Sequence, residues 1–181
     1  AKGWGNFISD RIIIWRLRMI SHQRRNAKMK TCISNEMKRY NHLVGEMNAV
    51  YHDISLHLGL SDSAMIILYT ICDNGDSCLL QEISRRSGVS KQTINSAIRK
   101  LEKEGIVYLK SVGSKNKIVC LTDKGKQLAK HTAIRLIEIE NDIFASWEKD
   151  DVEKYLTLTE RFLTSLKEKN KTRLFYVYDC N

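Results

Sequence analysis

The segment from Val89 to Gly105, VSKQTINSAIRKLEKEG, constrains the fold of this chain more than any other stretch. Ser90 is a favourable N-cap residue, so a helix is expected to begin directly after it. Apolar residues then recur at i, i+3, i+4 and i+7, the spacing that gives a helix one buried face; they are Ile94, Ala97, Ile98 and Leu101. The opposite face carries side chains that can exchange hydrogen bonds with the edges of bases; they are Gln92, Asn95, Ser96 and Arg99. The segment therefore predicts a helix with a core face and a recognition face.

The residues before this helix predict a second, shorter helix over 79–87. Gly88 follows it and can adopt the positive φ with which a chain leaves a helix. Two helices joined by a short turn that contains Gly form the helix-turn-helix pattern. The same pattern also fits two core helices of any small α domain, so the decision depends on the sequence that follows.

A β-hairpin is predicted directly after Gly105. The ranges 106–112 and 117–121 are rich in β-formers, and 113–116 has the composition of a turn. A helix-turn-helix followed at once by a hairpin is a winged helix. The hairpin tip is cationic, which suits contact with phosphates or with the minor groove.

Two runs of sequence carry a specific resemblance. They are LLQEISRRSGVSKQTINSAIRKLEKEGIV over 79–107 and LTDKG over 121–125, after the wing. Together they resemble the MarR family of winged helix-turn-helix transcriptional regulators, over roughly residues 35–169. Members often carry Asp-x-Arg in the wing where this chain has Gly113 and Lys115. Lys keeps the charge of Arg but lacks its planar fork, so phosphate contact is better supported than insertion into a narrow minor groove.

The positive charge of the chain is concentrated in two places. The formal net charge is +9 over 181 residues. Residues 85–117 hold nine Lys or Arg and two Asp or Glu, and residues 1–30 hold eight and one. Residues 31–84 are acidic, with two basic and seven acidic residues, and residues 118–181 are balanced. A basic patch on an otherwise neutral or acidic body is typical of nucleic-acid binding.

Long amphipathic helices flank the winged helix. The helix predicted over 35–58 has a heptad seam, typical of helices that pack along their length on other helices; the seam is Met37, Tyr40, Val44, Met47, Tyr51, Ile54 and Leu58. A helix capped by Thr122 is predicted to reach Trp147, with Leu128, Thr132, Leu136, Ile139 and Ile143 on the same face, and the last helix opens at Asp150 and Asp151. Their apolar surface exceeds what the winged helix can cover, which favours a subunit interface.

The predicted fold is mainly α with a small β-hairpin wing, a winged helix-turn-helix flanked by long N- and C-terminal dimerisation helices. The predicted segments are a basic amphipathic extension (1–30), an N-terminal dimerisation helix (31–60), the DNA-binding domain (61–122), C-terminal dimerisation helices (123–170) and a tail (171–181). The absence of proline suits a chain dominated by helices.

The predicted function is sequence-specific binding of double-stranded DNA by a homodimer on a pseudo-palindromic operator, and we expect a cytoplasmic repressor. Base contacts are assigned to the recognition face and phosphate contacts to Arg85, Arg86, Ser90, Lys91 and Thr93. The wing would hold the DNA backbone through Lys115, Asn116 and Lys117. The resemblance also implies that a small, often aromatic or anionic, effector can bind between the dimer helices and the reading unit. No cofactor is expected.

Several alternatives remain open from the sequence. Residues 1–30 can form a surface-lying amphipathic helix, an arm on DNA or on the partner subunit, or a segment foreign to the natural protein, with Met29 as the native start. The resemblance also implies that Cys32 is a candidate redox sensor, because some relatives use a cysteine in the first helix, and Lys28 and Lys30 can lower its pKa. The five cysteines include no Cys-x-x-Cys pair, which favours reduced thiols.

Other functional classes find little support. His52, Asp53 and His57 offer one weak candidate for a metal site. The chain has neither a phosphate-binding Gly-rich loop nor a nucleophile elbow, so an enzyme is not expected. It has no apolar run of about 18 residues, so no membrane span is expected. A winged-helix module that binds an acidic protein is the rival from another class.

Overall fold

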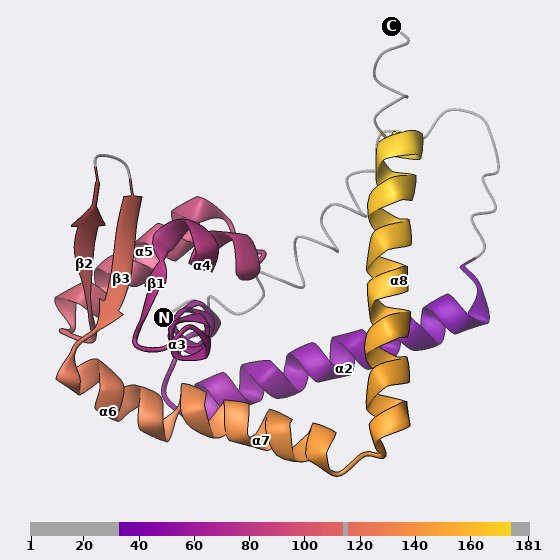
Figure 1. Cartoon of the computed structure of the whole chain (residues 1–181), viewed down its shortest axis with the longest axis horizontal. Helices are drawn as coiled ribbons and strands as arrows, with labels where there is room; N and C mark the ends of the chain where they lie inside the picture. Colours follow the sequence, from indigo (N-terminus) through magenta and orange to yellow (C-terminus); the bar gives the residue numbers. More distant parts are fainter. Residues whose placement is uncertain (1–32, 114–115, 175–181) are drawn as a thin grey trace, which may run out of the picture. The chain divides into compact units, whose positions relative to one another are not determined.

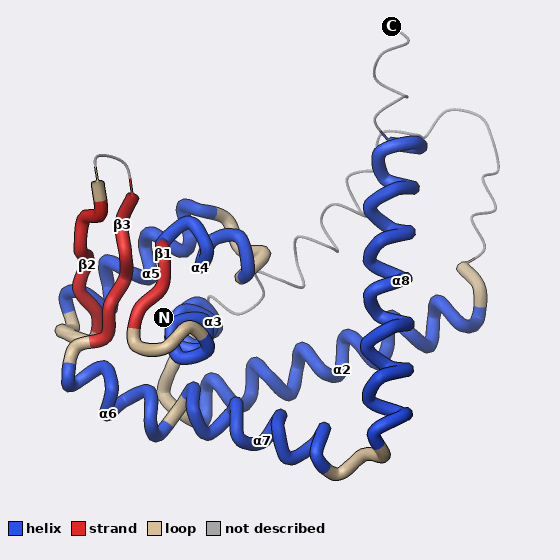
Figure 2. Tube along the Cα trace, in the orientation of Figure 1, coloured by secondary structure: helices blue, strands red, loops and turns tan. Residues whose placement is uncertain are grey.

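The computed structural model describes residues 33–113 and 116–174. The chain divides into two compact units with a boundary between Ile134 and Arg135. The first unit contains α2 (Asn35–His57), α3 (Asp62–Asp73), β1 (Ser77–Leu79), α4 (Leu80–Arg86), α5 (Lys91–Lys103), β2 (Val107–Val112), β3 (Asn116–Leu121) and α6 (Asp123–His131). The second contains most of α7 (Ala133–Ala145) and all of α8 (Lys149–Leu174). Figures 1 and 2 show a mainly helical chain with one small sheet, which confirms the predicted fold class.

The core of the first unit is built on α3. Ile67, Leu68 and Ile71 of α3 are fully buried, and α3 packs against α4, α5, α6 and the sheet. Four other elements each add a fully buried side chain to this core; they are Ile83 of α4, Ile94 of α5, Val107 of β2 and Val119 of β3. The helix-turn-helix and the wing therefore share one hydrophobic core.

The sheet has three antiparallel strands in the order β1-β3-β2. The predicted hairpin is confirmed, with Leu109 opposite Val119 in its register. The strand β1 was not predicted, because three residues are too few to show the period-two alternation of a strand. It pairs with β3 across about forty intervening residues, with Leu79 opposite Ile118. Leu79, expected to open the short helix, is thus the last residue of β1.

The helix predicted from Thr122 to Trp147 is wrong in its continuity, because the chain breaks at Thr132 into α6 and α7. Thr132 has φ −130° and ψ −91°, far from helical values. Its hydroxyl donates to the carbonyl of Leu128 at 2.7 Å, and its N–H donates to the carbonyl of Ala129 at 3.2 Å. The side chain thus takes the acceptor that the backbone would use in a continuous helix.

The two long flanking helices leave much of their apolar surface exposed. The predicted seam of α2 is nowhere fully buried, and Tyr40, Met47 and Tyr51 remain 44–47% exposed. In the second unit, α8 runs through Leu174, past the point where a tail was expected, and exposes six large apolar residues at 42–55%; they are Tyr155, Leu156, Leu158, Phe162, Leu163 and Leu166.

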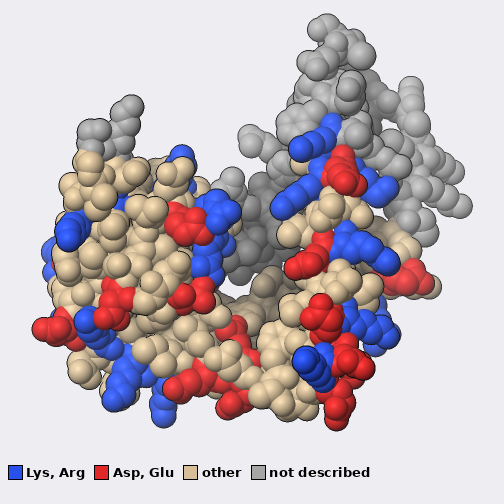
Figure 3. Space-filling view, in the orientation of Figure 1, with Lys and Arg blue, Asp and Glu red and all other residues tan. Residues whose placement is uncertain are grey.

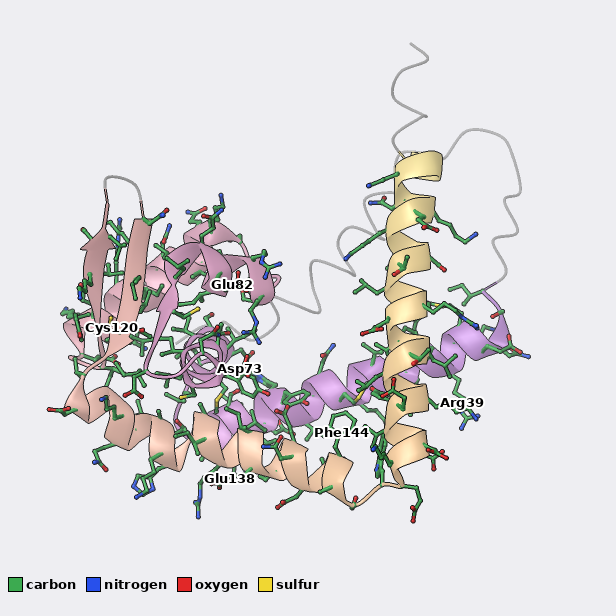
Figure 4. All side chains as sticks on the ribbon, viewed as in Figure 1. Arg39, Asp73, Glu82, Cys120, Glu138 and Phe144 are labelled. Carbon is green, nitrogen blue, oxygen red and sulfur yellow. The ribbon has the colours of Figure 1, made fainter. Side chains whose placement is uncertain are left out.

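An aromatic cluster joins α7 to α8 at their connection. Phe144 and Trp147 have ring centroids 5.5 Å apart, and Trp147 and Tyr155 meet edge to face at the same distance. Edge-to-face pairs at this spacing stabilise a packing beyond the area that they bury. The cluster therefore holds the turn between the two helices in place (Phe144 is labelled in Figure 4).

Among the described residues, no single helix is both long and apolar enough to cross a membrane. The helices α2 and α3, which meet at 91°, would suffice only as a bent pair and only by length and composition.

The first turn of α6 lies directly against backbone. A Cβ added at Gly125 would come within 2.0 Å of the carbonyl oxygen of Ile106, where no real Cβ is found. We therefore expect Gly125→Ala to lower the free energy of unfolding by about 1–3 kcal/mol, the usual cost of overpacking. Gly45→Ala is the matched control, because Gly45 lies in α2 with nothing within 4 Å of an added Cβ. It should stabilise the chain by about 0.5–1 kcal/mol. Denaturant unfolding of the two variants measures both values; equal stabilities would contradict the packing described here.

Candidate nucleic-acid interface

The helix α5 is held at its start by a cap and along its length by the core. The hydroxyl of Ser90 accepts a hydrogen bond from the Thr93 amide at 3.2 Å, as predicted for an N-cap. Gly88, with φ +62°, makes the turn from α4. Ile94, Ile98 and Leu101 are at most 3% exposed. The underside of α5 is therefore fixed, and its orientation decides which side chains face outward.

The four residues predicted for base contacts all lie on the outward face of α5. Gln92, Asn95, Ser96 and Arg99 are exposed. We call these four residues the recognition ridge. In the part of the chain that the structure describes, none of their side chains makes a hydrogen bond or an ion pair with another residue. Their donors and acceptors are therefore available to a ligand, which is what direct readout of bases requires.

The residues at the start of α5 divide between structure and surface. The hydroxyls of Ser90 and Thr93 lie 2.8 Å apart, and both residues are half-buried. Ser90 and Thr93 are thus engaged in capping, whereas the side chain of Lys91 is exposed. The capping role of Ser90 was predicted from the sequence, but the hydrogen bond between the hydroxyls of Thr93 and Ser90 was not.

The two arginines of α4 are each paired with a carboxylate. Arg85 donates to both carboxylate oxygens of Glu82, at 2.9 and 2.6 Å, and this hydrogen bonding holds the pKa of Glu82 below its usual value. Arg86 donates to Asp73, at the end of α3. Asp73 and Glu82 are labelled in Figure 4. A phosphate at either arginine would have to share that arginine with the carboxylate. The pair of Arg86 with Asp73 also links α4 to α3.

The wing carries cations on both of its faces. Asn116 and Lys117 are exposed at the start of β3, whereas Lys115 lies outside the described residues. Lys117 is opposite Ser111, and Lys110 is opposite Ile118. Because neighbouring residues of a strand point to opposite faces, Lys110 and Lys117 lie on different sides of the hairpin. Lys110 was missed from the sequence, although its place next to the tip could have indicated it.

Positive side chains of the first unit do not form an unbroken patch on the face that Figure 3 shows. In the view of Figure 3, Lys and Arg appear along its rim, beside the wing and beneath α6, with Asp and Glu among them. The cationic character of the interface therefore comes from the particular residues of α5 and the wing.

The metal site considered at His52, Asp53 and His57 does not form. The Nδ1 atom of His52 lies 2.9 Å from the Asp62 carboxylate and links α2 to α3. The Nδ1 atom of His57 lies 2.9 Å from the carbonyl of Asp53, within its own helix. The described part of the chain contains no group of three residues able to hold a metal ion.

The described cysteines are free thiols without the features of a redox sensor. Burial raises the pKa of Cys72 and of Cys78, so neither is poised to form a thiolate. Cys120 is buried. The predicted sensor, Cys32, lies outside the described residues, as does the extension over 1–30.

A helix-turn-helix, a hairpin stacked on the same core and an outward polar ridge define a winged-helix protein. Residues 58–115 match the sequence model of the MarR family. This match covers the winged helix and supports the predicted resemblance to MarR-type transcriptional regulators. A search of curated proteins finds no significant match to the whole sequence.

Solved structures of DNA-binding regulators, several of them described as MarR-family proteins, share the fold at low sequence identity. The regulator NMB1585 from Neisseria meningitidis is 19% identical, with a TM-score of 0.64 over 77% of this chain and 98% of that one. A putative MarR family regulator from Listeria monocytogenes, solved with a 26mer DNA, is 23% identical, with a TM-score of 0.56 over 82% and 97%. BpsR from Bordetella bronchiseptica, whose DNA binding is regulated by 6-hydroxynicotinic acid, is 15% identical, with a TM-score of 0.52 over 68% and 98%.

The cap of α5 yields a direct stability prediction. Ser90→Ala removes the side-chain acceptor of the Thr93 amide, so it should cost about 1 kcal/mol of unfolding free energy. Ser96→Ala, at an exposed position of the same helix, should stay within about 0.5 kcal/mol of wild type. Denaturant unfolding without DNA gives both numbers. A loss at Ser96 as large as that at Ser90 would show that Ser90 does not act as the cap.

Proposed function

We propose that this chain is a homodimeric regulator that binds a specific, pseudo-palindromic sequence of double-stranded DNA and represses transcription there. Each α5 would enter the major groove, and the two copies would lie about 34 Å apart along the duplex, one helical turn. The recognition ridge would contact base edges, with Gln92 and Asn95 suited to adenine and Arg99 to guanine.

The observation that carries this proposal is the recognition ridge itself. Four polar side chains face outward from a helix that is anchored on its other face by three buried side chains. These are Ile94, Ile98 and Leu101, which are at most 3% exposed. Lys91 is an exposed cation at the start of the same helix, and Lys117 is an exposed cation on the wing. Cations that border a polar helix face fit the division of labour at DNA, where phosphate contacts position the protein and base contacts specify the sequence.

The homodimer is supported by the exposed apolar residues of the second unit. Six large apolar side chains on α8 and three on α7 and its C-terminal end, Ile139, Ile143 and Trp147, are more than 40% exposed. Exposed apolar residues in such number mark an interaction site in a chain that must stay in solution. A twofold partner that offers the same surface would cover them, and twofold symmetry also matches a palindromic site.

The proposal includes control by a small effector molecule. The structural neighbour BpsR is regulated in this way by an aromatic acid. An effector needs only a higher affinity for one spacing of the two α5 helices than for the other, because it then shifts the population of the dimer.

One arginine variant tests the contact with bases, and one lysine variant tests the contact with phosphates. With a duplex selected by the wild-type chain from random DNA, Arg99→Ala should lose about 1–3 kcal/mol of binding free energy and relax the preference at one base pair. Lys117→Ala should weaken selected and random duplexes alike and reduce the slope of log affinity against log salt by about one. Binding titrations at several salt concentrations measure both effects.

These titrations also test the proposal as a whole. If Arg99→Ala keeps the wild-type ratio of selected to random affinity, the arginine does not read a base. If the wild-type chain binds no duplex even at low salt, the DNA-binding function is wrong, and a module for an acidic protein partner becomes the better interpretation.

The assembly is tested on the second unit. Sedimentation of the full chain at micromolar concentration should give twice the 21.0 kDa of one chain. Leu166→Glu places a charge where an apolar side chain is 55% exposed, and it should shift the population to monomer. Thr164→Glu adds the same charge to an exposed polar position of α8 and should leave the dimer intact. Equal masses for both variants would move the interface away from this face.

A further inference from the structure

Residues at the start of α6 donate hydrogen bonds to three consecutive carbonyls at the end of α5. The ammonium of Lys124 donates to the carbonyl of Glu104 at 2.8 Å. The hydroxyl of Thr122 donates to the carbonyl of Gly105 at 2.6 Å, and the Thr122 amide donates to that of Ile106 at 3.0 Å. These residues are some twenty positions apart in the chain, so the contacts are tertiary and not part of a local turn.

Each donor binds a carbonyl at the C-terminal end of α5 that has no partner within the helix. The chain leaves α5 through Gly105 at φ +69°, which turns its carbonyls away from the helical ladder. Carbonyls at the end of a helix lack intrahelical partners and carry partial negative charge. The ammonium of Lys124 supplies both a donor and a positive charge at that end.

The backbone packing beside these hydrogen bonds leaves little room for adjustment. Gly125 lies so close to Ile106 that no side-chain carbon fits between them. The amide of Gly125 also donates to the Thr122 hydroxyl at 3.0 Å, so one threonine caps α6 and binds the end of α5. Thr122, Lys124 and Gly125 thus form one contact surface, which we call the α6 clamp.

We propose that the α6 clamp sets the direction in which α5 presents its recognition ridge, and that Lys124 is a positioning residue for DNA reading although it lies outside α5 and the wing. This inference rests on the proposed DNA-binding function. Ser90 fixes the start of α5, and the clamp fixes its end. Lys124 acts through the carbonyl of Glu104 and not by contact with a phosphate.

The position of the clamp predicts where its loss is felt along the ridge. Arg99 lies five residues before Glu104, about 7–8 Å along the helix at 1.5 Å per residue. Gln92 lies near the other end, beside the Ser90 cap. Release of the clamp should therefore displace Arg99 more than Gln92, and it should relax the base preference assigned to Arg99 first.

The test compares the full-length wild-type chain with Lys124→Met, Lys124→Arg and the control Lys130→Met. Met keeps the length of the lysine side chain and loses the charge, whereas Arg keeps a cationic donor. Lys130 lies on the same helix and is exposed, and its side chain makes no hydrogen bond or ion pair with any residue that the structure describes. Both methionine variants remove one positive charge from α6, but only Lys124→Met also removes the contact with Glu104.

Two measurements are made on each variant. Amide hydrogen exchange without DNA should be about threefold to tenfold faster in the last turn of α5 and at 105–106 for Lys124→Met, as expected when one hydrogen bond is lost. Binding should show a similar fall in the ratio of selected to random affinity, with the salt slope unchanged. Lys124→Arg should keep most of the wild-type protection from exchange and most of the wild-type affinity ratio. Lys130→Met should match wild type in both measurements.

Each outcome decides the proposal. Unchanged exchange in Lys124→Met overturns the clamp. An equal loss on selected and random duplexes, with a salt slope reduced by about one unit, identifies a phosphate contact and overturns the positioning role. If the wild-type chain binds neither duplex, the proposed function fails separately, and the exchange comparison alone then decides whether the clamp holds α5.

Discussion

Burial of the underside of α5 is the interaction on which the rest of the molecule depends. Ile94, Ile98 and Leu101 anchor this helix on α3 and the sheet. At roughly 1.5–3 kcal/mol for each large apolar side chain removed from water, this burial far outweighs the exposed ion pairs around it. This burial determines which face of α5 points outward, and the hydrogen bonds at the two ends of the helix then fix its position more closely.

The parts of the fold that the sequence predicted are those governed by local chemistry. The Ser90 cap, the positive φ of Gly88 and the buried stripe of α5 all follow from neighbouring residues, and the structure has them. The parts that were missed depend on residues distant in the chain. The strand β1 exists because β3 is there to pair with it, and the break at Thr132 exists because its hydroxyl finds an acceptor in a buried setting.

The candidate site divides in the same way. Exposure of Gln92, Asn95, Ser96 and Arg99 could be predicted from helical periodicity alone. The pairing of Arg86 with Asp73 could not, because the two residues lie on different helices and thirteen positions apart. A count of cations therefore overstates the positive charge that is free for phosphates. The contact of Lys124 with the end of α5 was hidden for the same reason, since nothing near Lys124 in the sequence announces a carbonyl twenty residues earlier.

The short strand β1 has a consequence for how copies of this chain can associate. It covers one edge of β3 over only three residues, and β2 forms the opposite edge with Lys110 along it. Unpaired strand edges invite a strand from another molecule, and a very short edge or a charged one discourages this. The sheet is thus a poor template for intermolecular strand addition and fibre growth. The association proposed above would instead use the helical surfaces, where it can stop at a closed pair.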